Sequence, residues 1–297
     1  MSTARVSFVV AAMALIAGCS SSDDAGFSAD RPPRVAVTTS IWADVVSNIV
    51  CGDLATIVLI VPNGTDAHSF EPSLADRARL EDARLVVANG LGFESRLIDT
   101  IEAVEGAGTA VFRFGDHVDP LADDPHLWLD PSRVGQSLDA LVSALIDNAD
   151  LDPVAVRQCA SDYADELVEL DRRVVELIDA IPAERRLLVT NHDALGYFAD
   201  RYDLRVVGSI IPAKTTLAET NPAQLSELAR LIADANLPAI FAETLSPRDD
   251  ADALGQRLGD VVVVTLHTEA LTDAAGGAST YIDMVRTDAE LISEALR

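Results

Sequence analysis

Residues 152–182 read DPVAVRQCASDYADELVELDRRVVELIDAIP and lie near the middle of a chain of 297 residues. This stretch has no glycine and no proline between Pro153 and Pro182, and its apolar residues recur at helical spacing. Asp152 precedes Pro153 as a helix cap would, and Pro182 ends the pattern. At 1.5 Å per residue the predicted helix is roughly 40 Å long, which is enough to run the length of a two-lobed protein. Because a helical connector is stiff, we expect only a small lobe rotation on ligand binding.

On both sides of this helix, short β-branched runs alternate with amphipathic stretches, which is typical of parallel sheets with crossover helices. The fold class is therefore α/β, with two four-stranded parallel-sheet lobes, each flanked by helices and joined by a single long backbone helix. We expect an N-terminal lobe over 34–150, the connecting helix over 151–182 and a C-terminal lobe over 183–297. The first lobe has predicted strands at 35–39, 55–61, 85–88 and 110–114 and helices at 42–50, 74–83, 94–104 and 132–148. The second has strands at 187–190, 205–211, 239–242 and 261–266 and helices at 194–202, 222–235, 248–258 and 281–296.

The N-terminus has the pattern of an export signal. Arg5 precedes an apolar run, 6–17, which is too short to span a bilayer as a finished helix. The run ends in LIAGC at 15–19, which resembles a bacterial lipobox and implies cleavage of a signal peptide, 1–18, with lipid added at Cys19. Residues 19–33 are expected to form a flexible tether. The alternative is that the apolar run is not cleaved and itself anchors the protein in the membrane. Either interpretation places the folded part outside the cytoplasmic membrane. With lipidation, the protein is anchored to the outer face of the membrane or lies in the periplasm.

The chain is strongly acidic. It has 48 Asp and Glu against 22 Lys and Arg, for a net charge of −26, which excludes nucleic acid as a partner. The charge is spread along the chain, so it indicates a solvated surface, and we expect a monomer. Lys214 is the only lysine.

Cysteines are few. With Cys19 assigned to lipid, Cys51 and Cys159 remain, in a compartment that favours oxidation. The sequence cannot supply the Cα separation that a disulfide needs, so a bond between them and two isolated buried thiols stay as alternatives.

Histidines follow several of the predicted strands. Parallel strands bring their carboxyl ends to one edge of a sheet, where open α/β folds bind ligands, so imidazoles at those ends can converge. Such convergence indicates a metal site. Four of the five histidines fit this placement: His68 in a turn after 55–61, His126 in DPHLWLDP, His192 after 187–190 and His267 after 261–266.

Several motifs in fixed order then point to a family. From about residue 34 to the C-terminus the chain resembles the zinc/manganese solute-binding lipoproteins of bacterial metal ABC importers, the helical-backbone metal receptors of cluster 9 (A-I). The resemblance implies that an ion is held between two lobes and handed to a cognate permease driven by a cytoplasmic ATPase. An adhesion role, claimed for some relatives, stays open. The motifs are VTTSIWAD (37–44), DAHSFEP (66–72), LVVANGLGFE (85–94), DPHLWLDP (124–131), TNHDALGYF (190–198) and FAE (241–243).

The same resemblance implies a ligand set. His68, His126 and His192 match the family's first three ligands, two of them from the first lobe. The fourth is usually an aspartate, and here the matching stretch offers Glu269, whose side chain is one methylene longer. In this stretch His267 replaces an aromatic residue; we expect it to support the site, with a direct role as ligand as the alternative.

The same resemblance suggests how two further residues should be interpreted. Glu243 resembles a family carboxylate near the site and is expected to hydrogen-bond a ligand. His117 lies in a short acidic stretch, 116–124, where many zinc members have a long histidine-rich loop; we interpret this stretch as a solvated connector.

Three imidazoles and a carboxylate suit zinc, whereas a bidentate carboxylate would admit manganese, with iron as a third candidate. A secreted zinc hydrolase with Glu243 as general base is an alternative, but there is no His-Glu-x-x-His pair and four protein donors would close the coordination sphere. A receptor for a metal chelate, such as a siderophore or corrinoid, would need an aromatic or arginine-lined cleft, and aromatics are only 5% of the chain. We therefore predict a binding protein and not an enzyme.

Overall fold

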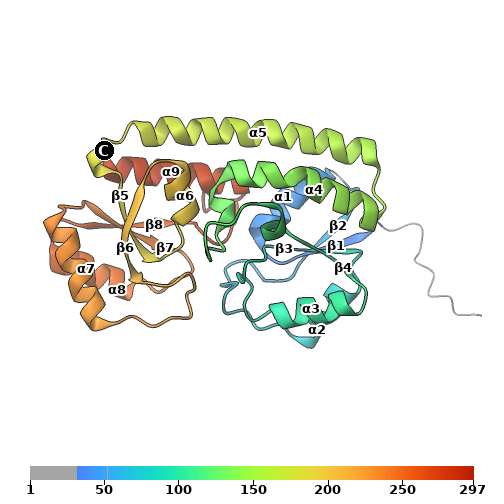
Figure 1. Cartoon of the computed structure of the whole chain (residues 1–297), viewed down its shortest axis with the longest axis horizontal. Coiled ribbons are helices and arrows are strands. Elements are labelled where there is room, and N and C mark those ends of the chain that lie inside the picture. Colours follow the sequence, from blue (N-terminus) through green and yellow to red (C-terminus); the bar gives the residue numbers. More distant parts are fainter. Residues whose placement is uncertain (1–31, 52) are drawn as a thin grey trace, which may run out of the picture. The chain divides into compact units, whose positions relative to one another are not determined.

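The computed structural model describes residues 32–51 and 53–297. The predicted signal peptide, Cys19 and nearly all of the predicted tether lie outside the described residues. From residue 32 to the C-terminus the chain forms one compact unit, in which two sheets lie side by side beneath a long helix (Figure 1).

The first sheet contains four parallel strands in the order β2-β1-β3-β4. Its strands are β1 (Arg34–Val37), β2 (Thr56–Leu59), β3 (Leu85–Ala88) and β4 (Ala110–Arg113). Helices α1 (Ser40–Val50) and α4 (Pro131–Ala149) cover the face nearer the long helix, and α2 (Leu74–Glu81) and α3 (Ile98–Gly106) lie on the other face (Figure 1). Two short 3-10 helices, η1 (Phe114–His117) and η2 (Leu127–Leu129), lie between β4 and α4.

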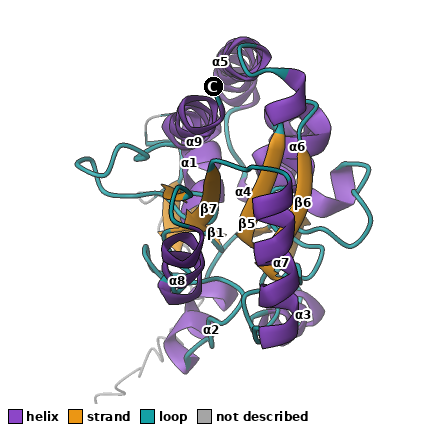
Figure 2. Ribbon diagram, turned by 90° about the vertical axis from the view of Figure 1, so that its left-hand side faces the viewer, coloured by secondary structure: helices purple, strands orange, loops and turns teal. Residues whose placement is uncertain are grey.

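The second sheet repeats this arrangement, with parallel strands in the order β6-β5-β7-β8. Its strands are β5 (Leu187–His192), β6 (Arg205–Ile211), β7 (Ala239–Glu243) and β8 (Val262–Leu266). Figure 2 shows these strands enclosed between helices above and below. The helices are α6 (Gly196–Arg201), α7 (Pro222–Asp234), α8 (Asp249–Leu258) and α9 (Tyr281–Leu296), and η3 (Ala183–Arg185) precedes β5.

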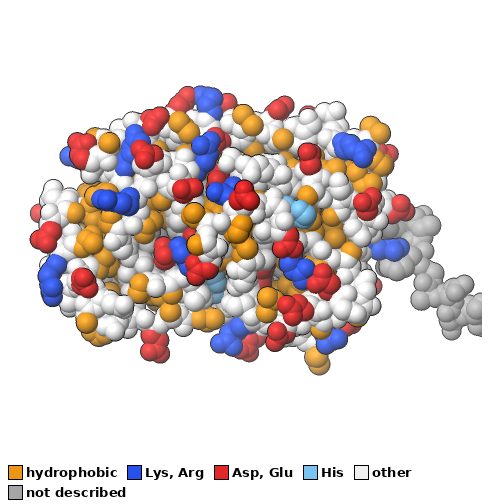
Figure 3. Space-filling model, in the orientation of Figure 1, with side chains coloured by type: hydrophobic (Ala, Val, Ile, Leu, Met, Phe, Trp, Pro, Cys, Tyr) orange, Lys and Arg blue, Asp and Glu red, His pale blue; other side chains and the backbone are white. Residues whose placement is uncertain are grey.

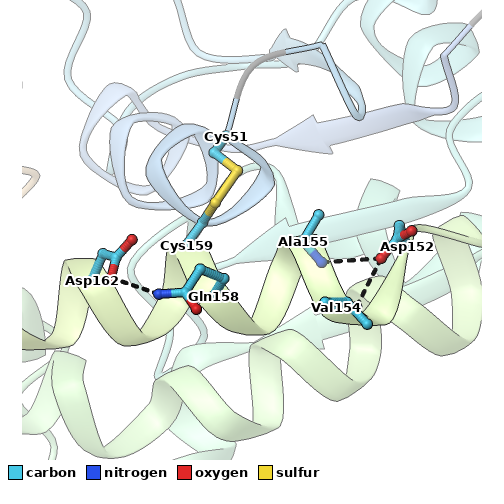
Figure 4. The surroundings of a disulfide bond; sticks show 7 residues. All are labelled: Cys51, Asp152, Val154, Ala155, Gln158, Cys159 and Asp162. Atoms are coloured by element: carbon cyan, nitrogen blue, oxygen red, sulfur yellow. Dashed lines mark hydrogen bonds between the residues drawn. A yellow bond between two sulfur atoms is a disulfide. The ribbon is translucent and has the colours of Figure 1, made fainter.

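Helix α5 (Pro153–Asp179) connects the two halves and packs on α1 and α4 of the first and on α9 of the second. The Asp152 carboxylate accepts hydrogen bonds from the backbone N–H groups of Val154 and Ala155, which caps the helix as its sequence predicts (Figure 4). The predicted fold class, two parallel α/β lobes with a long helix that contacts both, is confirmed.

Several element boundaries differ from the prediction. Strands β5 and β7 continue through His192 and Glu243, which pair with Ile211 and Leu266 in the ladder, because strand pairing does not require an apolar side chain. The helix predicted over 94–104 begins only at Ile98. The carboxylate of Glu94 instead turns back to accept from the Asn89 backbone N–H and the Thr38 hydroxyl. Buried polar pairing therefore replaces the first helical turn.

Cys51 and Cys159 form a disulfide with a Cα–Cα separation of 6.1 Å. Figure 4 shows it between the end of α1 and the first half of α5. The sequence left this pairing open, and the structure joins the two residues. The bond ties the connecting helix to the first lobe, and no disulfide joins that helix to the second lobe within the described residues.

Acidic and basic side chains are interspersed over the face drawn in Figure 3, in keeping with a solvated surface. Among the described helices, none is both long and apolar enough to cross a membrane.

Candidate metal centre

Four predicted ligand residues lie together. His68 follows β2 in a turn, His126 directly precedes η2, His192 is the last residue of β5, and Glu269 lies in the loop after β8. One nitrogen or oxygen atom from each lies within 4.8 Å of those from the others, and all four residues are buried. Residues far apart in the sequence thus form one interior cluster.

The donor atoms of this cluster converge on the Glu269 carboxylate. Its Oε1 lies 3.2 Å from His68 Nε2, 3.5 Å from His126 Nε2 and 3.2 Å from His192 Nε2. His68 Nε2 and both Glu269 oxygens are nevertheless buried without a directed hydrogen-bond partner. Because buried polar atoms normally have partners, this arrangement has the chemistry of a site for a cation that would coordinate all four side chains.

Two acidic residues orient two of the imidazoles. His126 Nδ1 lies 2.6 Å from Asp124 Oδ1, and His192 Nδ1 lies 2.8 Å from Glu243 Oε1. Each carboxylate engages the ring nitrogen that faces away from the cluster, so Nε2 is the nitrogen that faces it. Glu243 therefore contacts one of the candidate ligand histidines.

His68 is held by its backbone and by an aromatic ring. Its N–H donates to Asp66 Oδ1 at 2.8 Å, and its imidazole packs edge-on against Phe93 at 4.7 Å between ring centroids. The backbone N–H of His126 donates in the same way to Asp124 Oδ1 at 3.0 Å. Neither aspartate is among the residues predicted from the sequence, although the Asp-x-His spacing repeats at 66–68 and 124–126.

The loop that contains Glu269 is bonded to the first lobe. Trp128 Nε1 donates to the carbonyl oxygen of Thr268 at 2.7 Å, and the backbone N–H of Leu271 donates to Ser40 Oγ at 3.1 Å. Glu269 follows a strand of the second lobe in sequence, but its neighbours on both sides are held by the first lobe. The four residues therefore come two from each lobe, and the loop of Glu269 is in addition bonded to the first lobe.

Charge and burial act against each other at this site. Burial lowers the pKa of His192, but the Glu243 and Glu269 carboxylates outweigh it and raise that pKa to about 10. Burial opposes the charged form of His126 as well, and Asp124 and Glu269 raise its pKa. The three imidazoles hold the pKa of Glu269 well below its usual value although burial alone would raise it. Protonation of His192 is thus favoured without metal, and a divalent cation must displace that proton.

The other histidines lie outside this cluster. The backbone N–H of His267 donates to Asp288 Oδ1 at 2.9 Å, and burial lowers the pKa of its imidazole. His117 is exposed in η1, where its ring stacks on Phe112 at 4.6 Å. The prediction that His126 lies at a strand end is wrong, because η1 and a loop separate this residue from the end of β4.

Comparison with known proteins places this geometry in a family. The family model described as "Zinc-uptake complex component A periplasmic" (ZnuA) matches residues 35–295. This chain belongs to that family. Its members are solute-binding proteins and not enzymes, and they bind divalent metal for ABC import.

Individual relatives cover almost the whole chain. The manganese-binding lipoprotein MntA of Halalkalibacterium halodurans is 30% identical over 98% of this chain and 97% of its own length. The zinc-binding protein TroA of Treponema pallidum is 32% identical over 91% of this chain and 90% of its own. A solved structure of the periplasmic zinc-binding TroA superposes with a TM-score of 0.82 at 31% identity, covering 89% of this chain and 99% of that one. The iron-binding protein YfeA of Yersinia pestis is 25% identical over 88% and 85%.

The family membership has direct consequences for function. This protein is a divalent-metal-binding component of an ABC import system, a role that implies a permease as its partner. The hydrolase alternative is excluded by the family. Relatives named for manganese, zinc and iron match this chain at 25–32% identity, so the family does not fix the metal.

Proposed function

We propose that this protein captures zinc outside the cytoplasmic membrane and delivers it to the permease of an ABC importer. The observation that supports this most is the buried group of three histidine nitrogens and one glutamate oxygen within 4.8 Å of one another. His68, His126, His192 and Glu269 are the proposed ligands. Four donors of this kind match the tetrahedral site that zinc prefers.

The choice of zinc over manganese rests on donor type. Imidazole suits zinc well, whereas manganese favours oxygen ligands and higher coordination numbers. Three of the four donors are nitrogen, and the Glu269 carboxylate is the one donor that could bind through two oxygens and accommodate manganese. Iron remains the third candidate. A metal chelate is disfavoured because the four donors are buried and lie within 4.8 Å of one another, a spacing that suits a bare ion.

The export features of the sequence complete the proposal. The lipobox-like LIAGC at 15–19 supports an anchor at Cys19, and relatives include lipoproteins and periplasmic proteins. The acidic, lipid-anchored protein would act as a monomer at the outer face of the membrane, next to its permease and the cytoplasmic ATPase. An adhesion role has no support in the site and is not part of the proposal.

The test is metal analysis of protein purified without added metal, followed by competition titrations with zinc and manganese. We expect zinc to copurify and to bind at least about ten-fold more tightly than manganese, as the nitrogen-rich donor set favours. Glu269→Ala should weaken binding strongly, while His267→Ala should have a small effect. Tighter binding of manganese would overturn the choice of metal. Loss of binding in His267→Ala with normal binding in Glu269→Ala would overturn the assignment of the fourth ligand.

A further inference from the structure

A short segment of the second lobe reaches across to both Asp-x-His turns of the first. This segment, residues 212–217, follows β6, and we call it the strap. Lys214 Nζ lies 3.0 Å from Asp124 Oδ2, and the Thr216 hydroxyl donates to Asp66 Oδ2 at 2.7 Å. The strap therefore contacts the aspartate that precedes each of the two histidines of the first lobe.

In both turns the aspartate divides its oxygens between the histidine and the strap. Oδ1 of Asp66 accepts from the backbone N–H of His68, and Oδ1 of Asp124 accepts from that of His126. Oδ2 faces the strap in each case. In each turn a single carboxylate therefore contacts both the strap and the backbone of the histidine.

Lys214 also contacts the residue that follows the histidine of the second lobe. Its Nζ lies 2.8 Å from Asp193 Oδ2, and the backbone N–H of Asp193, the residue after His192, donates to the carbonyl of Ala213 at 3.1 Å. A single ammonium group therefore bridges the carboxylate that orients His126 and the residue next to His192. Since these lie in different lobes, Lys214 joins the lobes beside the cluster.

The surroundings of Asp124 are built for this bridge. The side chain of Asp124 is 1% exposed, and that of Lys214 is 27% exposed. Gly196, at the start of α6, leaves room for the carboxylate, because a Cβ there would lie 2.3 Å from Asp124 Oδ2. Removing the ammonium would leave a buried carboxylate with one ionic partner fewer, which is costly where water cannot replace it.

We propose that Lys214 is a positioning residue that holds the two lobes together over the captured cation and thereby slows its dissociation. The proposal rests on metal capture as the function of the site. Opening the lobes must break the Lys214–Asp124 and Thr216–Asp66 bonds, whereas the four donors keep their own geometry within each lobe. The strap therefore acts on the rate of release more than on the coordination of the ion.

The experiment measures zinc release from the full mature chain into excess chelator, together with zinc association. Loss of a partly buried, charge-assisted bond predicts that Lys214→Met dissociates zinc about ten-fold faster, with association changed much less. Lys214→Arg should restore most of the wild-type rate. Thr216→Val should accelerate release about three-fold, since a neutral bond is weaker. The visible spectrum of the cobalt-loaded protein should be the same in all variants.

Arg172→Met is the matched control. Arg172 also bridges two carboxylates, Glu169 and Glu176, but on the exposed face of α5. The Arg172→Met substitution removes one positive charge, as Lys214→Met does, and should leave the rate of zinc release unchanged. Dissociation from Lys214→Met within two-fold of wild type, or equal acceleration in Arg172→Met, would overturn the strap. Absence of zinc binding in the unsubstituted protein would instead overturn the proposed function on which the strap rests.

Discussion

The two lobes have the same sheet topology but present their histidines differently. In the first lobe, His68 and His126 lie in loops, and an aspartate two residues earlier fixes each backbone. In the second lobe, His192 is the last residue of a central strand, and Glu243 at the end of the neighbouring strand orients its ring. A strand end is held by its ladder, whereas a loop needs side-chain bonds, so equivalent sheets reach the same cluster by different means.

The lobes also differ in how firmly they hold the cluster. The first lobe bonds the residues on both sides of Glu269 and is joined to α5 by the disulfide. Part of the second lobe packs as a separate hydrophobic cluster around Val189, Ile210 and Ile240. Leu188 and Leu195, which lie on either side of His192 in the sequence, instead pack in the larger core that both lobes share.

The largest expected effect comes from removing a proposed ligand. His68→Ala and His192→Ala each delete a nitrogen donor from the cluster and should weaken zinc binding at least about a thousand-fold, as expected when a four-coordinate site loses a ligand. Calorimetric competition with a chelator measures this loss. His117→Ala, an exposed histidine on η1, is the control and should bind as wild type. Near-normal affinity in either ligand variant would show that the two lobes do not share the ion.

The next effect concerns the carboxylates that orient the rings. Glu243→Gln and Asp124→Asn keep shape but lose charge, and each should cost about 10–100-fold in zinc affinity, as for other outer-sphere partners. The β-ladder still fixes the backbone of His192 when Glu243 loses its charge, whereas His126 lies in a loop. Glu243→Gln should therefore reduce zinc affinity less than Asp124→Asn does. Equal losses from the two variants would show that the strand end gives no such advantage.

A smaller effect is expected from pH. The raised pKa of His192, about 10, means that its imidazole carries a proton at pH 7 in the metal-free protein. Zinc must displace that proton, so affinity should rise by about ten-fold per pH unit between pH 6 and 8 for each proton released. Proton release measured in buffers of different ionisation enthalpy checks this. Glu243→Gln should flatten the slope, and an affinity independent of pH would contradict the assignment.

The raised pKa of His192 has the opposite effect on the stability of the metal-free protein: stability falls as pH rises, whereas zinc affinity increases. A histidine whose folded pKa is raised stabilises the fold fully below its unfolded value near ~6.5, and this contribution is lost as pH rises towards 10. Metal-free protein should therefore become less stable over the range in which zinc binding strengthens. Denaturant melts of the metal-free protein at pH 6 and pH 9 measure this change.

The smallest expected effect is on overall shape. Because α5 contacts both lobes along its length and contains no glycine or internal proline, zinc binding should leave the radius of gyration nearly unchanged. Solution scattering of metal-free and zinc-bound protein tests this. A marked compaction would show that the connector bends and that the lobes close on the ion.

Local patterns in the sequence already indicated much of this molecule. Helical periodicity and capping residues predicted α5, and alternating β-branched runs predicted the strands of both sheets, because such features depend on neighbours in the chain. Most errors lay at element ends. Polar residues such as Glu94, which binds Thr38, and His192, which binds Glu243, make tertiary contacts there that override the local pattern.

The sequence by itself determined the two-lobed α/β fold and, with the family resemblance, the four residues that cluster in the interior. Only the tertiary structure decided which groups support them. It brought Asp66 and Asp124 to the strap, joined Cys51 to Cys159, and bonded the loop of Glu269 to the first lobe. The physical reason is that periodicity and capping arise between residues a few positions apart, whereas these contacts join residues that only the packing of helices and sheets brings together.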